Sequence, residues 1–229
     1  VRGSATQAGV QNYDDLYADI LLWTEKGWID YVTPQLYWKI GKKIVDYPIL
    51  LDWWIKYSYG RHLYVGHSMG NGAEEIQKQI DMLRERGYDK VQGSFYWSSN
   101  ALVRAPRARK GEAAPTTNPM NEMLRKENAR IAIVPPMPWK DMTAAPEVKD
   151  VKVAGTQALC EVSWTPVYSD NLMYFLVYKF PKGVAVDTSN PTYLVGKVWY
   201  DNESVARYVD KEGAKGEFTY AITTLTRNN

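Results

Sequence analysis

Thiol and imidazole groups are scarce in this chain. Its 229 residues include one cysteine, Cys160, and two histidines, His62 and His67. A single cysteine excludes an internal disulfide and a thiolate metal site, and two histidines cannot form a metal cluster unaided. Cys160 lies in the alternating run LCEVSW, which favours a buried core position over a nucleophile. The sequence therefore predicts no metal and no cofactor.

Long apolar runs and a strong charge of either sign are also missing. No stretch is long and apolar enough to predict a membrane span. A net charge of +2 gives no reason to expect nucleic acid as a partner. The chain begins with VRGS rather than methionine, which suggests a mature or excised piece. The absence of a signal peptide therefore says little about its compartment.

Phenylalanine is the rare aromatic residue, with 4 copies against 9 of tryptophan and 17 of tyrosine. Tyrosine and tryptophan carry a polar group on an aromatic ring, and they suit surfaces that bind sugars or other flat, hydroxylated ligands. They also suit an ordinary core. Composition alone therefore favours a sugar-binding protein only slightly.

Residues 12–100 alternate between helical and strand patterns. We expect Asn12 to cap the first helix and Gly27 to end it. The alternation of strands and helices is the βαβ pattern, which predicts a parallel sheet. The periodicity predicts helices over 13–26, 47–56 and 73–86, and strands over 28–38, 62–66 and 91–97.

The rest of the chain differs in character. Residues 104–145 are rich in Arg, Pro and Ala and predict a linker with a short helix over 118–126. Residues 146–229 alternate in the all-β manner of a sandwich. The expected fold class is thus an α/β unit over 1–103, a linker, and a β-sandwich. The sandwich strands are predicted over 147–153, 159–164, 174–179, 193–199, 206–209 and 216–223.

Hydrogen-bonding and stacking side chains gather where the predicted parallel strands end. The carboxyl ends of such strands form the functional edge of α/β sheets. Internal hydrogen bonds would equally satisfy these side chains, so a structural role stays open for each. The candidate substrate-binding residues are Gln35, Tyr37, Trp38, Tyr64, His67, Tyr96 and Trp97.

Alternation along each strand predicts which side chains share a face. The apolar faces are expected under helices and the more polar faces toward an interior. A doubly wound sheet is apolar on both faces, so the lumen of a barrel explains the polar faces better. Trp53 and Trp54 are adjacent on a helix, so we expect one in the core and one exposed. The predicted apolar faces carry, strand by strand, Val32, Pro34 and Leu36; Leu63 and Val65; and Val91, Gly93 and Phe95. The opposite, more polar faces carry, in the same order, Thr33, Gln35 and Tyr37; Tyr64 and Gly66; and Gln92, Ser94 and Tyr96.

Four segments, WIDYVTPQLYW, YPILLDWW, LYVGH and VQGSFYWSS, occur in an order typical of a known family. They resemble the bacterial glycosyl-hydrolase-like proteins that are distantly related to family-10 glycosidases. These are (β/α)8 TIM-type barrels, and some act on the glycan strands of peptidoglycan. The resemblance covers residues 1–140 and implies the C-terminal portion of the barrel. It also implies a secreted or cell-envelope, periplasmic protein.

The segments CEVSW, YFLVYKF and GEFTYAITTL resemble a fibronectin type III module. The resemblance implies that Trp164 is its core tryptophan and Tyr220 its late-strand tyrosine. About six strands are predicted, against about seven in a complete sandwich of this kind. A missing edge strand and a partial barrel would both leave surface that needs a partner. We therefore expect the fold to be completed by another copy, by a separate N-terminal half, or not at all.

Catalysis is harder to place. Glycoside hydrolysis normally needs two carboxylates that flank the bond, and no predicted strand ends in Asp or Glu. The resemblance implies that the catalytic carboxylate belongs to the earlier half of the barrel. Glu74, after the HSMGNG loop, is the candidate that remains in this chain.

Two functions stay open. The chain is expected to be a C-terminal fragment of a glycoside hydrolase that acts on polysaccharide or peptidoglycan and contributes sugar-binding residues. Alternatively, it is a non-catalytic scaffold that binds carbohydrate or cell wall. In both cases the expected partner is a glycan strand.

Overall fold

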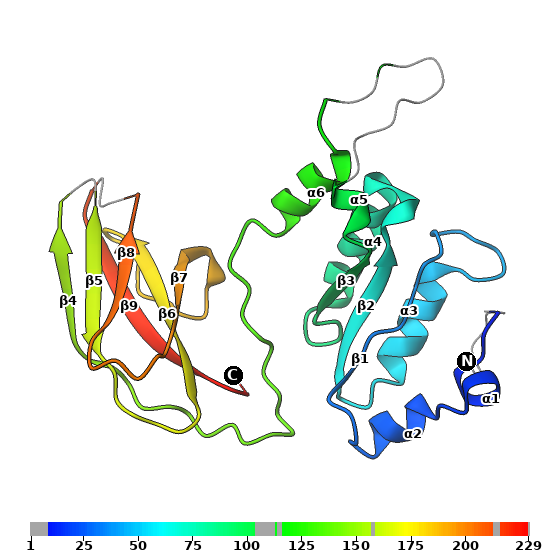
Figure 1. Ribbon diagram of the computed structural model, residues 1–229, viewed down its shortest axis with the longest axis horizontal. Helices are drawn as coiled ribbons and strands as arrows, with labels where there is room; N and C mark the ends of the chain where they lie inside the picture. The colour runs from blue at the N-terminus through cyan, green and yellow to red at the C-terminus, as the bar shows by residue number, and fades with distance from the viewer. Residues whose placement is uncertain (1–8, 104–112, 114–115, 157–158, 213–215, 229) are drawn as a thin grey trace. The chain divides into compact units, whose positions relative to one another are not determined.

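The structure, a computed structural model, describes residues 9–103, 113, 116–156, 159–212 and 216–228 (Figure 1). It divides into two compact units, Val1–Glu127 and Asn128–Asn229. The first unit combines helices with a parallel sheet, and the second is built from antiparallel strands.

The sheet of the first unit contains β1 (Tyr31–Val32), β2 (His62–Ser68) and β3 (Gly93–Trp97), all parallel and in that order. The connecting helices are α3 (Tyr47–Lys56) and α4 (Ala73–Arg86). The predicted βαβ order and the bounds of both helices are confirmed. Among the described residues these strands close into no barrel, and their place in a larger barrel stays a prediction.

One face of this sheet is covered by helices. Val32, Leu63 and Val65 are at most 5% exposed and form one core cluster with α3 residues such as Leu50 and Leu51. Burying each such side chain contributes about 1.5–3 kcal/mol. A second cluster joins α4 to α6 (Pro119–Glu127), the short helix predicted over 118–126. A short helix α5 (Asn100–Val103), which was not predicted, contributes to this second cluster.

The single helix predicted over 13–26 is wrong. Two short helices replace it, α1 (Asn12–Leu16) and α2 (Ile20–Glu25). The helical conformation is interrupted at Tyr17, which has a φ of 50°. The Asp19 carboxylate accepts the backbone N–H of Leu22 at 3.0 Å, so this residue starts a helix instead of continuing one. Gly27 ends α2 as predicted, with φ of 69°.

The strand predicted over 28–38 is also shorter than expected. Only Tyr31–Val32 forms a ladder, followed by a single parallel bridge between Gln35 and Gly66. Pro34 has no N–H to donate, which interrupts the ladder. Its carbonyl still accepts the N–H of Gly66 at 2.9 Å, so the segment continues beside β2.

The two adjacent tryptophans of α3 are both buried, which contradicts the expectation that one is exposed. Trp53 is 9% and Trp54 5% exposed, with ring centroids 5.2 Å apart and edge to face. Ile20 and Leu21 of α2 pack against the same cluster. α2 therefore contributes to the core that surrounds α3.

Two three-stranded antiparallel sheets make up the second unit, with orders β4-β5-β8 and β7-β6-β9. The six strands predicted from the alternation are all found. Their bounds are β4 (Lys149–Gly155), β5 (Cys160–Thr165), β6 (Leu172–Pro181), β7 (Leu194–Trp199), β8 (Ala206–Asp210) and β9 (Phe218–Thr226).

The core of the second unit lies between these two sheets. Trp164 of β5 is 1% exposed and meets Phe175 of β6 edge to face, with ring centroids 5.3 Å apart. Val162 and Val177 join the same cluster, and Cys160 is buried as predicted. Trp164 is thus a core residue, and the fibronectin type III assignment stays a prediction.

Candidate functional site

Aromatic side chains line the side of the first sheet that α3 and α4 do not cover. We call this side the open face; it carries Tyr31, Tyr64, Phe95 and Trp97. Side chains of registered partners in a parallel ladder share a face, and the register pairs Gly66 with Phe95 and Ser68 with Trp97. Phe95 is 52% and Trp97 67% exposed. The ring of Tyr64 meets those of Tyr31 and Phe95 edge to face, with centroids 5.7 and 5.9 Å apart.

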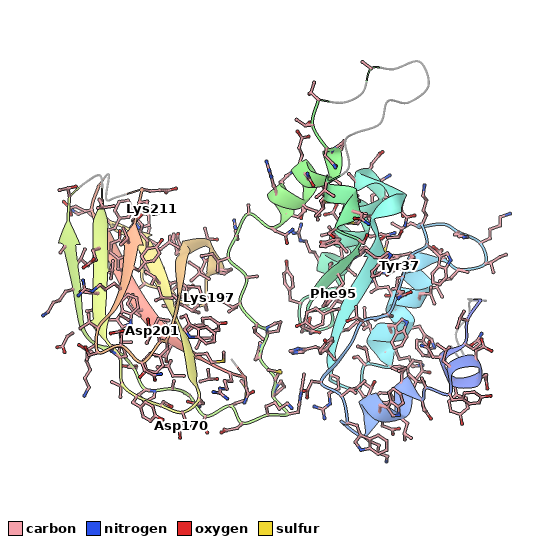
Figure 2. The ribbon with its side chains drawn as sticks, in the orientation of Figure 1. Tyr37, Phe95, Asp170, Lys197, Asp201 and Lys211 are labelled. Carbon is pink, nitrogen blue, oxygen red and sulfur yellow. The ribbon has the colours of Figure 1, made fainter. Side chains whose placement is uncertain are left out.

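Two glycines make room for rings on the open face. A Cβ on Gly93 would lie 3.1 Å from Cδ1 of Tyr64, and one on Gly66 would lie 3.6 Å from Cε1 of Tyr37. The rings of Tyr64 and Tyr37 therefore lie directly over the strand backbone. Figure 2 labels Tyr37 and Phe95, which both neighbour Gly66.

The face assignment predicted for β3 is wrong. Phe95 was expected under helices, with Ser94 and Tyr96 on the polar side. The register instead places Ser94 beside Val65 and Tyr96 beside His67, on the covered face. Tyr96 packs against the cluster that joins α4 and α6. The polar side chains of this strand are half-buried, because they find partners on the covered face, and the side chains of Phe95 and Trp97 are exposed.

His67 is the centre of a buried polar network on the covered face. Its Nδ1 lies 2.9 Å from Oε1 of Gln79, and its Nε2 lies 3.1 Å from Oγ of Ser94. The Gln79 amide donates to the carbonyl of Trp38 at 3.0 Å, so its oxygen must face the histidine. His67 therefore carries its proton on Nδ1 and accepts from Ser94. With 0% exposure and both nitrogens bonded, it supports the site from behind.

Burial lowers the pKa of His67 below 6.5, although the hydrogen bond to Gln79 opposes the shift. Just below pH 6.5, the unfolded chain therefore binds a proton at His67 that the folded chain does not bind. The free energy of unfolding should therefore fall as pH drops below 6.5, by at most about 1.4 kcal/mol per pH unit. Urea unfolding of the wild type and of His67→Gln between pH 7 and 5 tests this. The variant should lose that part of the slope; equal slopes would mean that His67 is not held neutral.

A pocket of about 350 Å³ lies where the segment after β1 leaves the sheet. The loop that forms it is tied to the HSMGNG segment and to α4. Asn71 Nδ2 donates to the carbonyl of Tyr37 at 3.1 Å, and the N–H of Ile40 donates to the Glu75 carboxylate at 2.8 Å. These bonds hold the loop in place. The lining residues are Tyr37, Trp38, Lys39, Ile40, Gly41, Lys42 and Asn71.

Three polar residues of this pocket were missed by the sequence analysis: Lys39, Lys42 and Asn71. The run YWKIGKK follows the strand directly, and this basic segment was a signal that could have identified the two lysines. Asn71 lies 34 positions from Tyr37 in the chain, so only the fold reveals their contact.

The predicted binding residues separate into two groups. Tyr37 and Trp38 share the pocket, and Tyr64 and Trp97 lie on the open face beside it, while Gln35 is exposed and bridges to Gly66 through its backbone. His67 and Tyr96 lie on the covered face, with ring centroids 5.7 Å apart. The structure thus does not bring these two together with the others.

Glu74, the candidate carboxylate, lies in the first turn of α4 beside Glu75. Its side chain is 89% exposed and lies 3.8 Å from Lys78, one turn along the helix. The residues that line the pocket include no carboxylate. Among the described residues, no three His, Cys, Asp or Glu side chains gather closely enough to hold a metal ion, and no helix has the length and apolarity to cross a membrane.

Comparison with known proteins supports a glycosidase-like character. Residues 3–82 match the family described as Glycosyl hydrolase-like 10. Glycosyl hydrolase YngK of Bacillus subtilis (strain 168) is 37% identical over 163 residues, which are 66% of this chain and 30% of the relative. Glycosyl hydrolase DigH of Escherichia coli (strain K12) is 33% identical over 98 residues, 35% of this chain and 22% of the relative. The chain therefore spans less than a third of the length of these curated relatives.

Proposed function

We propose that the first unit forms the sugar-binding wall of a glycosidase-type site, in a protein that acts on polysaccharide or on the glycan strands of peptidoglycan. The observation that carries this proposal is the pocket of Tyr37 and Trp38 next to the aromatic open face. The likeness to a glycosyl hydrolase-like family and to two glycosyl hydrolases supports it.

The chemistry of the pocket suits a sugar. A pyranose ring presents C–H groups on its faces and hydroxyl groups at its rim. The rings of Tyr37 and Trp38 in the pocket, and the ring of Trp97 on the open face, offer stacking surfaces for the former. Asn71, Lys39 and Lys42 offer polar groups for the latter, and a lysine ammonium would also bind an anionic substituent.

Cleavage of a glycosidic bond needs carboxylates that this pocket does not supply. We propose that β1–β3 belong to the C-terminal portion of a (β/α)8 barrel whose other strands provide them. A secreted or cell-envelope location, and a fibronectin type III character for the second unit, complete this proposal. Contact with another copy or with an N-terminal half would then cover the open face.

A non-catalytic scaffold that binds glycans is the second candidate. The observation in its favour is the position of Glu74, which is exposed and paired with a lysine of its own helix. Glycosidase acids are kept protonated by burial or by a neighbouring carboxylate. The Glu74 side chain, at 89% exposure, is not buried.

Binding to oligosaccharides prepared from peptidoglycan and from plant polysaccharides tests the proposal. We expect Trp97→Ala and Tyr37→Ala each to weaken binding about tenfold, which corresponds to about 1.4 kcal/mol of lost stacking. The matched control is Trp28→Ala. Trp28 is also 67% exposed but precedes β1, at the opposite end of the strands, so its replacement should leave the affinity unchanged.

The same samples distinguish the two candidate functions. Equal affinities for wild type, Trp97→Ala and Tyr37→Ala would exclude the sugar-binding wall. New reducing ends that appear with the wild type and vanish in Glu74→Gln would make Glu74 catalytic. Binding without cleavage is expected if the carboxylates lie on other strands.

A further inference from the structure

A second groove, in the β-sandwich unit, is independent of the site described above. It has a volume of about 410 Å³, within the roughly 300–1,000 Å³ typical of small-molecule sites. Three places in the chain form it: the turn before β6 with the first residues of that strand, the end of β7 with the residues after it, and the residue after β9. Its principal lining residues are Tyr168, Asp170, Trp199, Tyr200, Asn202 and Arg227.

The aromatic part of this groove is exposed yet held in place. Trp199 is 54% and Tyr168 69% exposed, so both rings are accessible to a ligand. The rings of Trp199 and Tyr174 meet edge to face, with centroids 4.8 Å apart. Nζ of Lys197 lies 4.9 Å from the centroid of the Tyr174 ring. Tyr200 is fixed from below by an edge contact of 5.7 Å with the core residue Phe175. A ligand would therefore meet rings that are already oriented.

The polar part of the groove surrounds these rings. The Tyr168 hydroxyl donates to Oδ1 of the Asp170 carboxylate, and a carboxylate can accept further hydrogen bonds. Asn202 contributes an amide and Arg227 a guanidinium, so the groove presents donors as well as acceptors. The opposite charges of Asp170 and Arg227 give it no strong overall sign. This combination suits a neutral, hydroxylated ring that stacks on one face and bonds at its rim.

We propose that this groove is a second carbohydrate-binding site, which takes a neutral pyranose unit of a glycan chain. The proposal goes beyond the site of the first unit and does not depend on it, because the two lie on separate units. A proline-rich peptide, which also docks on exposed tyrosine and tryptophan rings, is the competing occupant. The three polar side chains that converge on the groove favour the sugar.

Chemical-shift mapping by NMR on the whole chain tests the proposal. Neutral β-linked oligosaccharides at roughly 10 mM would nearly saturate even a site with a Kd of 1 mM. We expect shifts at the Trp199 indole and at residues 168–173, 199–202 and 227. Shifts confined to the first unit would overturn this proposal and support the other site. Shifts at the sandwich groove alone would support this proposal and count against the site of the first unit.

Two aspartates provide a matched pair of variants. Asp170→Asn removes the charged acceptor of the groove and should weaken binding at least fivefold. Asp201→Asn changes an exposed aspartate that lies outside the lining, and it should have no effect; Figure 2 labels both. Arg227→Ala serves as a second test because Arg227 is exposed and its loss should not affect folding. Groove shifts with a polyproline peptide but with no sugar, or equal affinities in all variants, would overturn the proposal.

Discussion

Gln79→Ala is expected to destabilise the first unit by about 3–5 kcal/mol. The side chain is 0% exposed and makes three hydrogen bonds, to His67, to the carbonyl of Trp38 and to Glu75. Replacement by alanine removes all three hydrogen bonds. Each buried polar group that then lacks a partner lowers the free energy of unfolding by about 1–3 kcal/mol. The Trp38 loop also loses one of its two attachments to α4, the bond from Gln79, and keeps the bond from Ile40 to Glu75, so sugar affinity should fall with stability. Urea unfolding and hydrogen exchange of peptides from 35–46 measure both effects.

The neighbouring Gln77 is the natural control for this variant. It lies on the same helix, and its amide donates to the exposed Asp81 at 2.9 Å. Gln77→Ala should change stability by less than about 0.5 kcal/mol. If Gln79→Ala were equally mild, the network would not hold the loop, and the support role of His67 would fall with it.

Asp210→Ala is expected to destabilise the second unit by about 3–5 kcal/mol. Its carboxylate is buried and accepts from Lys179 Nζ at 2.6 Å and from the Tyr220 hydroxyl at 2.7 Å. Burial raises the pKa of Asp210, but these hydrogen bonds outweigh it and hold the pKa below 3.8. The charged pair therefore persists at neutral pH, and its contribution is lost only as pH falls through that lower pKa. Removing the carboxylate leaves the lysine largely buried without this counter-charge.

An exposed ion pair in the same unit provides the comparison. Lys182 and Glu217 lie 2.7 Å apart, with both side chains 74% exposed. Glu217→Ala should cost at most about 1 kcal/mol, because water screens such pairs. The double variant Lys179→Met with Asp210→Ala should recover much of the lost stability. If the double variant were as unstable as Asp210→Ala alone, the cost would come from packing and not from the unpaired lysine.

Much of the fold could be predicted because local patterns and tertiary packing agree. The helix over 47–56 begins with a proline in its first turn, and the helix over 73–86 ends at a glycine. Both were placed correctly. The helix over 13–26 failed because Asp19 forms a cap within a continuous apolar pattern. Propensity sums cannot register one side-chain hydrogen bond of this kind.

The candidate site was predicted less well, for a similar reason. Alternation assigns residues to two faces but does not say which face the helices cover. In β3 the buried partners of Ser94 and Tyr96 decide this, and His67, 27 residues before Ser94 in the chain, is one of them. The strand-end rule identified Tyr37 and Trp38, which do share a pocket. It could not identify Asn71, which reaches that pocket through a turn of a different segment.

The exposure of strand β4 affects how the second unit responds to mechanical tension. All seven of its residues are exposed, its ladder shifts register between Lys149 and Lys152, and its partner in the sheet is β5. Few apolar contacts therefore hold it, and its main attachment is one row of backbone hydrogen bonds. Tension that reaches the sandwich through residue 148 would load these bonds one after another from the open end of the hairpin. Ala145 and Val148, just before β4, pack in the core cluster of Trp164 and Phe175, so we expect β4 to detach only after these two residues have been released.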